Sequence, residues 1–289
     1  MPTKAITFDF FTFKSQTSDA LEQALIKELA TRKLGNFNNV KVVDFYARIR
    51  EIANENDLWI CNAEKVNVLD EAYIGDLQGS REALAQQDDQ GPIFDTIFLY
   101  NPKNQVIALQ RNRSGLGMNT FISYLCKLTS CDDVELEVII DPNTLIKLNK
   151  MSLVKSIEYK ISRPTNFTFA RGAKRGLSGD IDFLRFFQGD SLKVVIGSDK
   201  GNKLGKPAIL SKVKNLLTNS QSIEKLNVSG QIEGDMETID LIKQRIIFTK
   251  KKYLKKHKKL TVDMIMETVK EAYNYHKTNL NRMYINRDE

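Results

Sequence analysis

A chain of 289 residues, of which 42% are hydrophobic and 27% charged, has room for one large or two ordinary globular domains. The net charge of +7 is uneven: residues 1–130 hold 14 lysines and arginines against 16 acidic residues, and residues 131–289 hold 29 against 20. Three cysteines without a CxxC spacing argue against a disulfide framework or structural zinc, and no stretch approaches the ~20 apolar residues of a membrane span. We therefore expect a cytoplasmic protein without a membrane span, whose second half meets an anionic partner.

The first half contains both strand and helix patterns. Lys4–Phe13 is apolar on both faces and predicts a well-covered strand, and leucines at helical spacing predict a helix over Ala20–Arg32. Asp57–Val66 is predicted as a further strand. Ile93–Tyr100 and Gln105–Arg111 flank a proline turn and predict a hairpin.

The second half has a more regular rhythm. Its main predicted elements are strand Val134–Ile140, helix Asn143–Lys150, strand Leu153–Ile161, strand Leu192–Ile196, helix Pro207–Leu217 and strand Ile223–Val228. This order is the split βαβ or ferredoxin-like plan, interrupted by a basic loop with a helix over Ile181–Gln188. A strand, a lysine run and a long helix from Thr261 follow. We therefore expect an α+β protein of two domains, residues 1–130 and a ferredoxin-like domain of residues 131–289.

Two glycine-rich basic loops bracket the strand Leu192–Ile196, and Lys250–Lys259 holds seven lysines in ten residues. Glycine lets the backbone approach a ligand closely, and neighbouring lysine or arginine neutralises phosphate. Each motif alone is also explained by a solvated turn. Combined with the uneven charge, they predict contact with the phosphates of DNA, through Arg171, Lys174, Arg175, Lys200, Lys203, Lys206, Lys212, Lys214, Lys251, Lys252 and Lys255.

Two other motifs have competing interpretations. Asp141, followed by Glu158 and Lys160 on the next strand, imitates the pattern of metal-dependent nucleases, although a solvent-facing charge pair also explains it. The inserted helix carries three phenylalanines that could stack on bases, but their helical spacing favours packing against the core: Phe183, Phe186 and Phe187.

Catalytic chemistry finds little support elsewhere. The histidines His257 and His276 have no serine, cysteine or aspartate at a characteristic spacing. We therefore expect no catalytic residue, no metal and no cofactor, and a protein that is not an enzyme; a nuclease using Asp141, Glu158 and Lys160 is the alternative.

The order of these features resembles the RexA family of phage-exclusion proteins. The similarity is best in Asp95–Leu125, Ser191–Lys214 and Met266–Leu280. The family comprises dimeric, two-domain proteins that bind DNA without marked sequence preference, and its basic segment matches Lys200, Lys203 and Lys206 here. The loop in this chain is richer in glycine and lacks arginine. The resemblance implies a homodimer acting in antiviral defence, with a possible partner protein of the same system.

Overall fold

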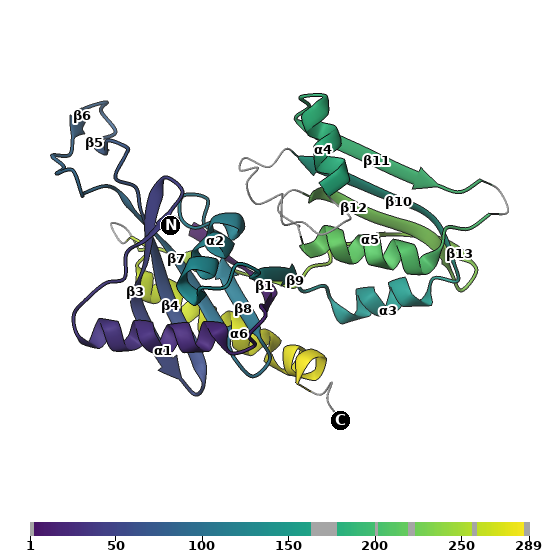
Figure 1. The fold of residues 1–289 in the computed structure, drawn as a ribbon, viewed down its shortest axis with the longest axis horizontal. Coiled ribbons are helices and arrows are strands. Elements are labelled where there is room, and N and C mark those ends of the chain that lie inside the picture. Colours follow the sequence, from purple (N-terminus) through teal and green to yellow (C-terminus); the bar gives the residue numbers. More distant parts are fainter. Residues whose placement is uncertain (1–2, 163–177, 200–201, 219–222, 256–258, 286–289) are drawn as a thin grey trace. The chain divides into compact units, whose positions relative to one another are not determined.

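The computed structural model describes residues 3–162, 178–199, 202–218, 223–255 and 259–285 (Figure 1). The chain is an α+β protein that divides into two compact units. The first unit combines residues 1–135 with residues 247–289, and the second contains residues 136–246. We expected residues 131–289 to form one domain. Instead, the C-terminal strand and helix belong to the first unit, because the strand pairs with the N-terminal strand.

The first unit is built on an antiparallel sheet. From one edge to the other, its strands are β14 (Ile247–Tyr253), β1 (Thr3–Lys14), β8 (Val106–Gln110), β7 (Ile93–Asn101), β4 (Leu58–Val66), β3 (Phe45–Glu55) and β2 (Val40–Val42). The predicted hairpin is confirmed as β7 and β8. A separate small hairpin pairs β5 (Tyr73–Gly75) with β6 (Arg81–Ala83).

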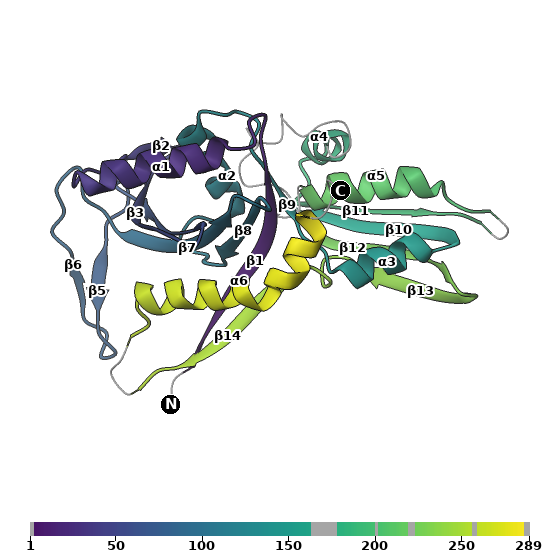
Figure 2. The same cartoon turned by 90° about the horizontal axis from the view of Figure 1, so that it is seen from below.

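Helices cover both faces of this sheet. In Figure 2, α1 (Ala20–Lys33) and α2 (Met118–Thr129) lie on one face, and α6 (Val262–Tyr284) lies on the other. The central strands are therefore buried on both sides, and they include buried polar residues such as Asn62 and Thr96. The long terminal helix is confirmed and begins after Thr261, whose hydroxyl accepts from the backbone of Met264.

The second unit is built on a four-stranded antiparallel sheet, with the order β11 (Ser191–Gly197), β10 (Leu153–Ser162), β12 (Ile223–Ile232) and β13 (Asp235–Asp240). Its helices are α3 (Pro142–Lys150), α4 (Ser178–Phe186) and α5 (Lys206–Thr218). They pack against the face that carries the buried side chains Ile157, Tyr159 and Val228. Ser156, Glu158 and Lys160 alternate with this set along β10 and occupy the opposite face.

The ferredoxin-like plan is not confirmed. It requires the first strand of the second half to join the same sheet as the later ones. That strand is β9 (Glu135–Val138), which is not part of the four-stranded sheet, whereas β13 occupies one edge. Periodicity along the chain identified the elements but not their pairing, since pairing depends on contacts between distant residues.

None of the helices in the described part of the chain combines the length and apolar character that a membrane crossing requires.

Candidate nucleic-acid interface

The predicted DNA-contacting cations belong to both units. Lys203, Lys206, Lys212 and Lys214 are in the second unit, whereas Lys251, Lys252 and Lys255 are in the first. Arg171, Lys174, Arg175 and Lys200 lie outside the described residues. The positive charge itself concentrates in the second unit, where residues 136–246 contain 18 lysines and arginines against 12 acidic residues.

Two of the predicted lysines hold the helices of the second unit together. The Nζ of Lys206 donates to the backbone carbonyls of Asn149 and Met151 at the end of α3, the latter at 3.1 Å. The Nζ of Lys212 donates to Asp180 at 2.7 Å and lies 4.9 Å from the ring centre of Tyr159. These contacts give both ammonium groups a structural role, which explains their positions without a ligand.

Lys203 and Lys214 are more accessible. Lys203 is exposed in the segment before α5, and Lys214 is exposed on α5 itself, next to the buried Val213. Both side chains therefore meet solvent. They remain candidates for contact with phosphate.

The lysine run begins on a strand, not in a loop. β14 extends through Tyr253 and is an edge strand of the first sheet. Lys250 forms an ion pair with Glu271 of α6, and Lys251 is exposed. Lysines on an edge strand hinder pairing with the edges of other molecules. This structural role accounts for Lys251 and Lys252 without nucleic acid.

A row of lysines crosses the second sheet on the face opposite its helices. Lys160 of β10 lies directly between Lys193 of β11 and Lys225 of β12 in the strand register. Glu158 accepts from Lys193 at 2.9 Å and from Lys225 at 2.8 Å, and Glu224 pairs with Lys160 at 2.6 Å. The two lysine hydrogen bonds, first that of Lys225, lower the pKa of Glu158. We call Lys160, Lys193 and Lys225 the lysine row.

Sequence reasoning missed two members of this row. Lys193 lies between Leu192 and Val194, an alternation that does predict an outward orientation on a strand, whereas Lys225 follows Glu224 and gives a weaker signal. Their alignment with Lys160 depends on the register of three strands, and the sequence alone does not specify that register.

The residues of the nuclease alternative have other partners. The carboxylate of Asp141 accepts from the backbone of Asn143 at 2.9 Å and caps α3. Glu158 bridges two lysines, and Lys160 pairs with Glu224. No cluster of three or more histidine, cysteine, aspartate or glutamate side chains suited to a metal occurs among the described residues. Ion pairs therefore account for Glu158 and Lys160, and helix capping accounts for Asp141.

The phenylalanines of the inserted helix do not pack into the core, contrary to our expectation. Phe183, Phe186 and Phe187 are 56%, 81% and 63% exposed. Their rings contact one another, with centres 4.8 and 5.0 Å apart. Leu184 is buried and helps to seat α4. The spacing that we assigned to core packing thus describes an outward-facing apolar cluster, because helical periodicity identifies a face without saying what it meets.

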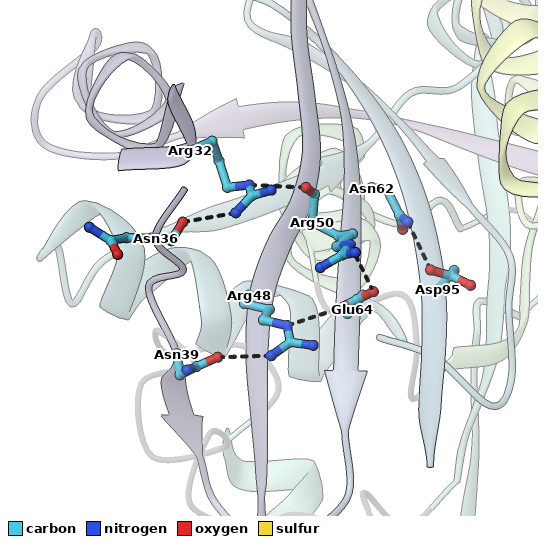
Figure 3. Close-up of polar contacts among 8 residues, drawn as sticks. All are labelled: Arg32, Asn36, Asn39, Arg48, Arg50, Asn62, Glu64 and Asp95. Carbon is cyan, nitrogen blue, oxygen red and sulfur yellow. Dashed lines mark hydrogen bonds and ion pairs between the residues drawn. The ribbon is translucent and has the colours of Figure 1, made fainter. Parts of the chain in front are cut away.

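A second polar cluster lies on β3 and β4, near the β2 edge of the first sheet (Figure 3). Arg32, Arg48 and Arg50 surround the ring of Phe37, with guanidinium carbons 3.7, 4.9 and 5.0 Å from its centre. The nearly buried Glu64 accepts from Arg48 at 2.7 Å and lies 4.0 Å from Arg50.

Backbone contacts explain why these arginines converge. The register of β3 shifts between Ile49 and Glu51, which marks a bulge, and the carbonyl of Arg50 accepts from Arg32 at 3.1 Å instead of from a strand. Arg32 also donates to the carbonyl of Asn36. The cluster therefore fastens the segment after α1 to the bulged strand, and its positive charge is offset by Glu64.

One carboxyl group of the first unit is buried in the core. Glu28 of α1 is 3% exposed and accepts from Asn38 at 2.7 Å, while its second oxygen has no hydrogen-bond partner. The hydroxyl of Tyr124 on α2 is also buried without a partner. Burial raises the pKa of Glu28 above its ordinary value. We interpret Glu28 as a cost to the stability of this unit at neutral pH.

Comparison with known protein families gives one match that spans nearly the whole chain. Residues 1–282 match a family described as Family of unknown function (DUF6731). The chain belongs to this family. No match is found among curated proteins.

Proposed function

We propose that the protein binds DNA through phosphate contacts, without marked sequence preference, and that the second unit supplies the main contact surface. The observation that carries this proposal is the lysine row. Neighbouring strands are about 4.8 Å apart, so the three lysine side chains leave the same face of the sheet next to one another. Like charges directly opposite each other are destabilising, and an anion lying over them relieves that repulsion.

Glu158 indicates which chemistry fits the row. Its carboxylate accepts one hydrogen bond from each outer lysine, as the oxygens of a phosphate would. The lysine side chains are between 41% and 60% exposed, so phosphates have access to them. The 18 basic residues against 12 acidic ones in the same unit add long-range attraction, to which Lys203 and Lys214 contribute.

The binding test uses fluorescence anisotropy with two unrelated DNA duplexes over a series of salt concentrations, and a duplex RNA for comparison. Replacing Lys160, Lys193 and Lys225 together by glutamine should weaken binding to both DNA sequences alike. The slope of log affinity against log salt should decrease by about 0.9 for each phosphate that the variant no longer neutralises.

The control carries the same charge change in the first unit, with Lys33, Lys41 and Lys277 replaced by glutamine, since all three are exposed there. It should retain wild-type affinity apart from a small general electrostatic reduction. Equal weakening in the two triple variants, or no DNA binding by the wild type, would contradict the proposal.

Glu158→Gln should change the DNA affinity in the opposite direction to the triple lysine variant. Removing the carboxylate that occupies two of the lysines should strengthen DNA binding several-fold. A nuclease would instead lose cleavage on this substitution, so plasmid DNA incubated with Mg²⁺ or Mn²⁺ separates the two functions. Activity in phage exclusion, a homodimer and a defence partner stay predictions from the resemblance, because the matched family has no assigned function.

A further inference from the structure

The edge strand β11 is unusually open to pairing. It ends the four-stranded sheet, and no strand in the described part of the chain pairs with its outer side. Its second half is aliphatic, with Val195 60% and Ile196 44% exposed, and Lys193 is its one charged residue. An exposed, regular and apolar edge is a template for adding a strand from another chain.

The exposed phenylalanines of α4 lie near the start of this strand. α4 ends at Phe186 and β11 begins at Ser191, and the short connection keeps the two elements in contact. Figure 1 shows α4 at the end of the sheet where β11 begins. The phenylalanine cluster lies beside the start of β11, and the exposed aliphatic residues lie near its end. We call these two apolar patches together the β11 edge surface: Phe183, Phe186, Phe187, Val195 and Ile196. Apolar side chains gathered in this way on a soluble unit mark an interaction site.

We propose that the β11 edge surface binds a second copy of this chain, with the two β11 strands antiparallel about a twofold axis perpendicular to the sheet. A register centred on Val194 pairs Leu192 with Ile196 and Lys193 with Val195. Each pair then lies on one face of the joined sheet, and no lysine opposes another lysine. This self-complementarity of pattern and charge favours the chain's own strand as the occupant, since a twofold interface uses the same patch from both copies.

The same register accounts for the position of the phenylalanines. Antiparallel pairing places Ser191 of one copy opposite Gly197 of the other. α4, which lies near the start of β11, then approaches the end of the second copy's strand. Ile196 is exposed there on the helical face, where Phe186 of the other copy would cover it. A strand pair extended by aromatic packing buries more apolar area than the edge alone.

This arrangement has a consequence for binding that rests on the proposed function. A twofold axis perpendicular to the sheet places the helix-free faces of both copies on the same side. The two lysine rows then lie on one continuous sheet, and one DNA molecule can engage both. Bivalent attachment raises the apparent affinity without any new kind of contact.

Light scattering coupled to size exclusion tests the association directly. The wild type at about 100 µM should have twice the chain mass of 33.0 kDa. Ile196→Lys and Phe186→Ser, which alter exposed side chains, should both reduce it to the mass of one chain. Met236→Lys changes a residue that is 61% exposed on the opposite edge strand and should leave the dimer intact.

A monomeric wild type would overturn the inference, as would a dimer that Met236→Lys disrupts and Ile196→Lys does not. Retained circular dichroism confirms that each variant is folded. These results are independent of the DNA proposal, because a monomeric Ile196→Lys that still binds DNA in the anisotropy assay supports the lysine row by itself.

A cross-linking experiment tests the register. Opposed residues in an antiparallel pair have Cα atoms about 4.5–5.5 Å apart, within the range that a disulfide spans. Val194→Cys should therefore form a disulfide with its own copy in the dimer, identified by mass spectrometry of the linked peptide. Met236→Cys should not. A dimer without the linked peptide at residue 194 would overturn the proposed pairing.

Discussion

The two units expose their sheets to very different degrees. The first sheet is covered by helices on both faces, and its edge strand β14 carries consecutive lysines. The second sheet has helices on one face, a lysine row on the other and an aliphatic edge strand. Lysine therefore protects an edge in the first unit and lies across a face in the second. The sheet position of a basic residue, and not its density in the sequence, distinguishes a protected edge from the lysine row for which we propose a binding role.

The largest expected difference between the units concerns their phenylalanines. Phe98 is fully buried and contacts Phe121 at a ring distance of 5.0 Å, so Phe98→Ala should destabilise the first unit by about 3–5 kcal/mol. Phe186→Ala changes a side chain that is 81% exposed and should cost less than about 0.5 kcal/mol. Urea unfolding followed by the fluorescence of Trp59 reports the first unit, and hydrogen exchange reports the second. Comparable destabilisation by Phe98→Ala and Phe186→Ala would contradict the expected difference between the two units.

An intermediate effect on the pH dependence of stability is expected from Glu28 and Glu158, whose pKa values are shifted in opposite directions. Burial raises the pKa of Glu28 in the folded protein, because the ionised carboxylate is costly to bury. The cost to the free energy of unfolding is therefore relieved as the pH falls through the raised pKa and the carboxyl group becomes protonated. Glu28→Gln should increase the stability of the first unit at pH 7 and flatten its dependence between about pH 4 and 7.

Glu158 of the second unit has the opposite pKa shift to Glu28. Hydrogen bonds from Lys225 and Lys193 lower the pKa of folded Glu158, so its contribution is present above its ordinary pKa and is lost as pH falls through the lowered value. Glu158→Gln should therefore act on the second unit alone, with a small destabilisation near pH 7 that disappears in acid. Hydrogen exchange between pH 3 and 7 measures both effects. Shifts of the same sign in the two variants would contradict these assignments.

The smallest expected effect on folding concerns the edge of the first sheet. Lys251→Val should change the free energy of unfolding by less than about 0.5 kcal/mol, because the side chain is exposed. Its effect should appear as association that increases with concentration, measured by light scattering, because an edge strand loses a protecting charge. Lys33→Val on the exposed side of α1 is the matched control. Equal association of both variants would mean that β14 needs no such protection.

Local patterns predicted much of the fold and little of the interface. Alternation along Lys4–Phe13 identified β1, and the helix expected from Thr261 corresponds to α6, since both signals come from residues close together in the sequence. The pairing of Thr3 with Tyr253 was not predictable, because a local pattern does not say which distant strand completes a sheet. For the same reason the C-terminal segment was assigned to the second domain instead of the first.

The candidate site shows the same limit. Lys206 and Lys212 belong to the predicted basic segment. Their ammonium groups, however, donate hydrogen bonds to carbonyls at the end of α3 and to the carboxylate of Asp180. Conversely, Lys193 and Lys225 stand in no recognisable motif, and the strand register aligns them with Lys160. Composition identified the basic half correctly, because charge counts need no geometry, but the choice among its lysines required the three-dimensional arrangement.

The discontinuity of the first unit has a consequence for synthesis on the ribosome. β1 emerges first, yet its partner β14 and the covering helix α6 follow only after residues 136–246 have been translated. The second unit can therefore fold while the first sheet is still incomplete. Until the C-terminal segment is made, β1 lacks its partner β14, and the face that α6 covers is exposed. Such nascent intermediates are vulnerable to misassembly, and the exposed period includes the translation of all of residues 136–246 as well as of β14 and α6.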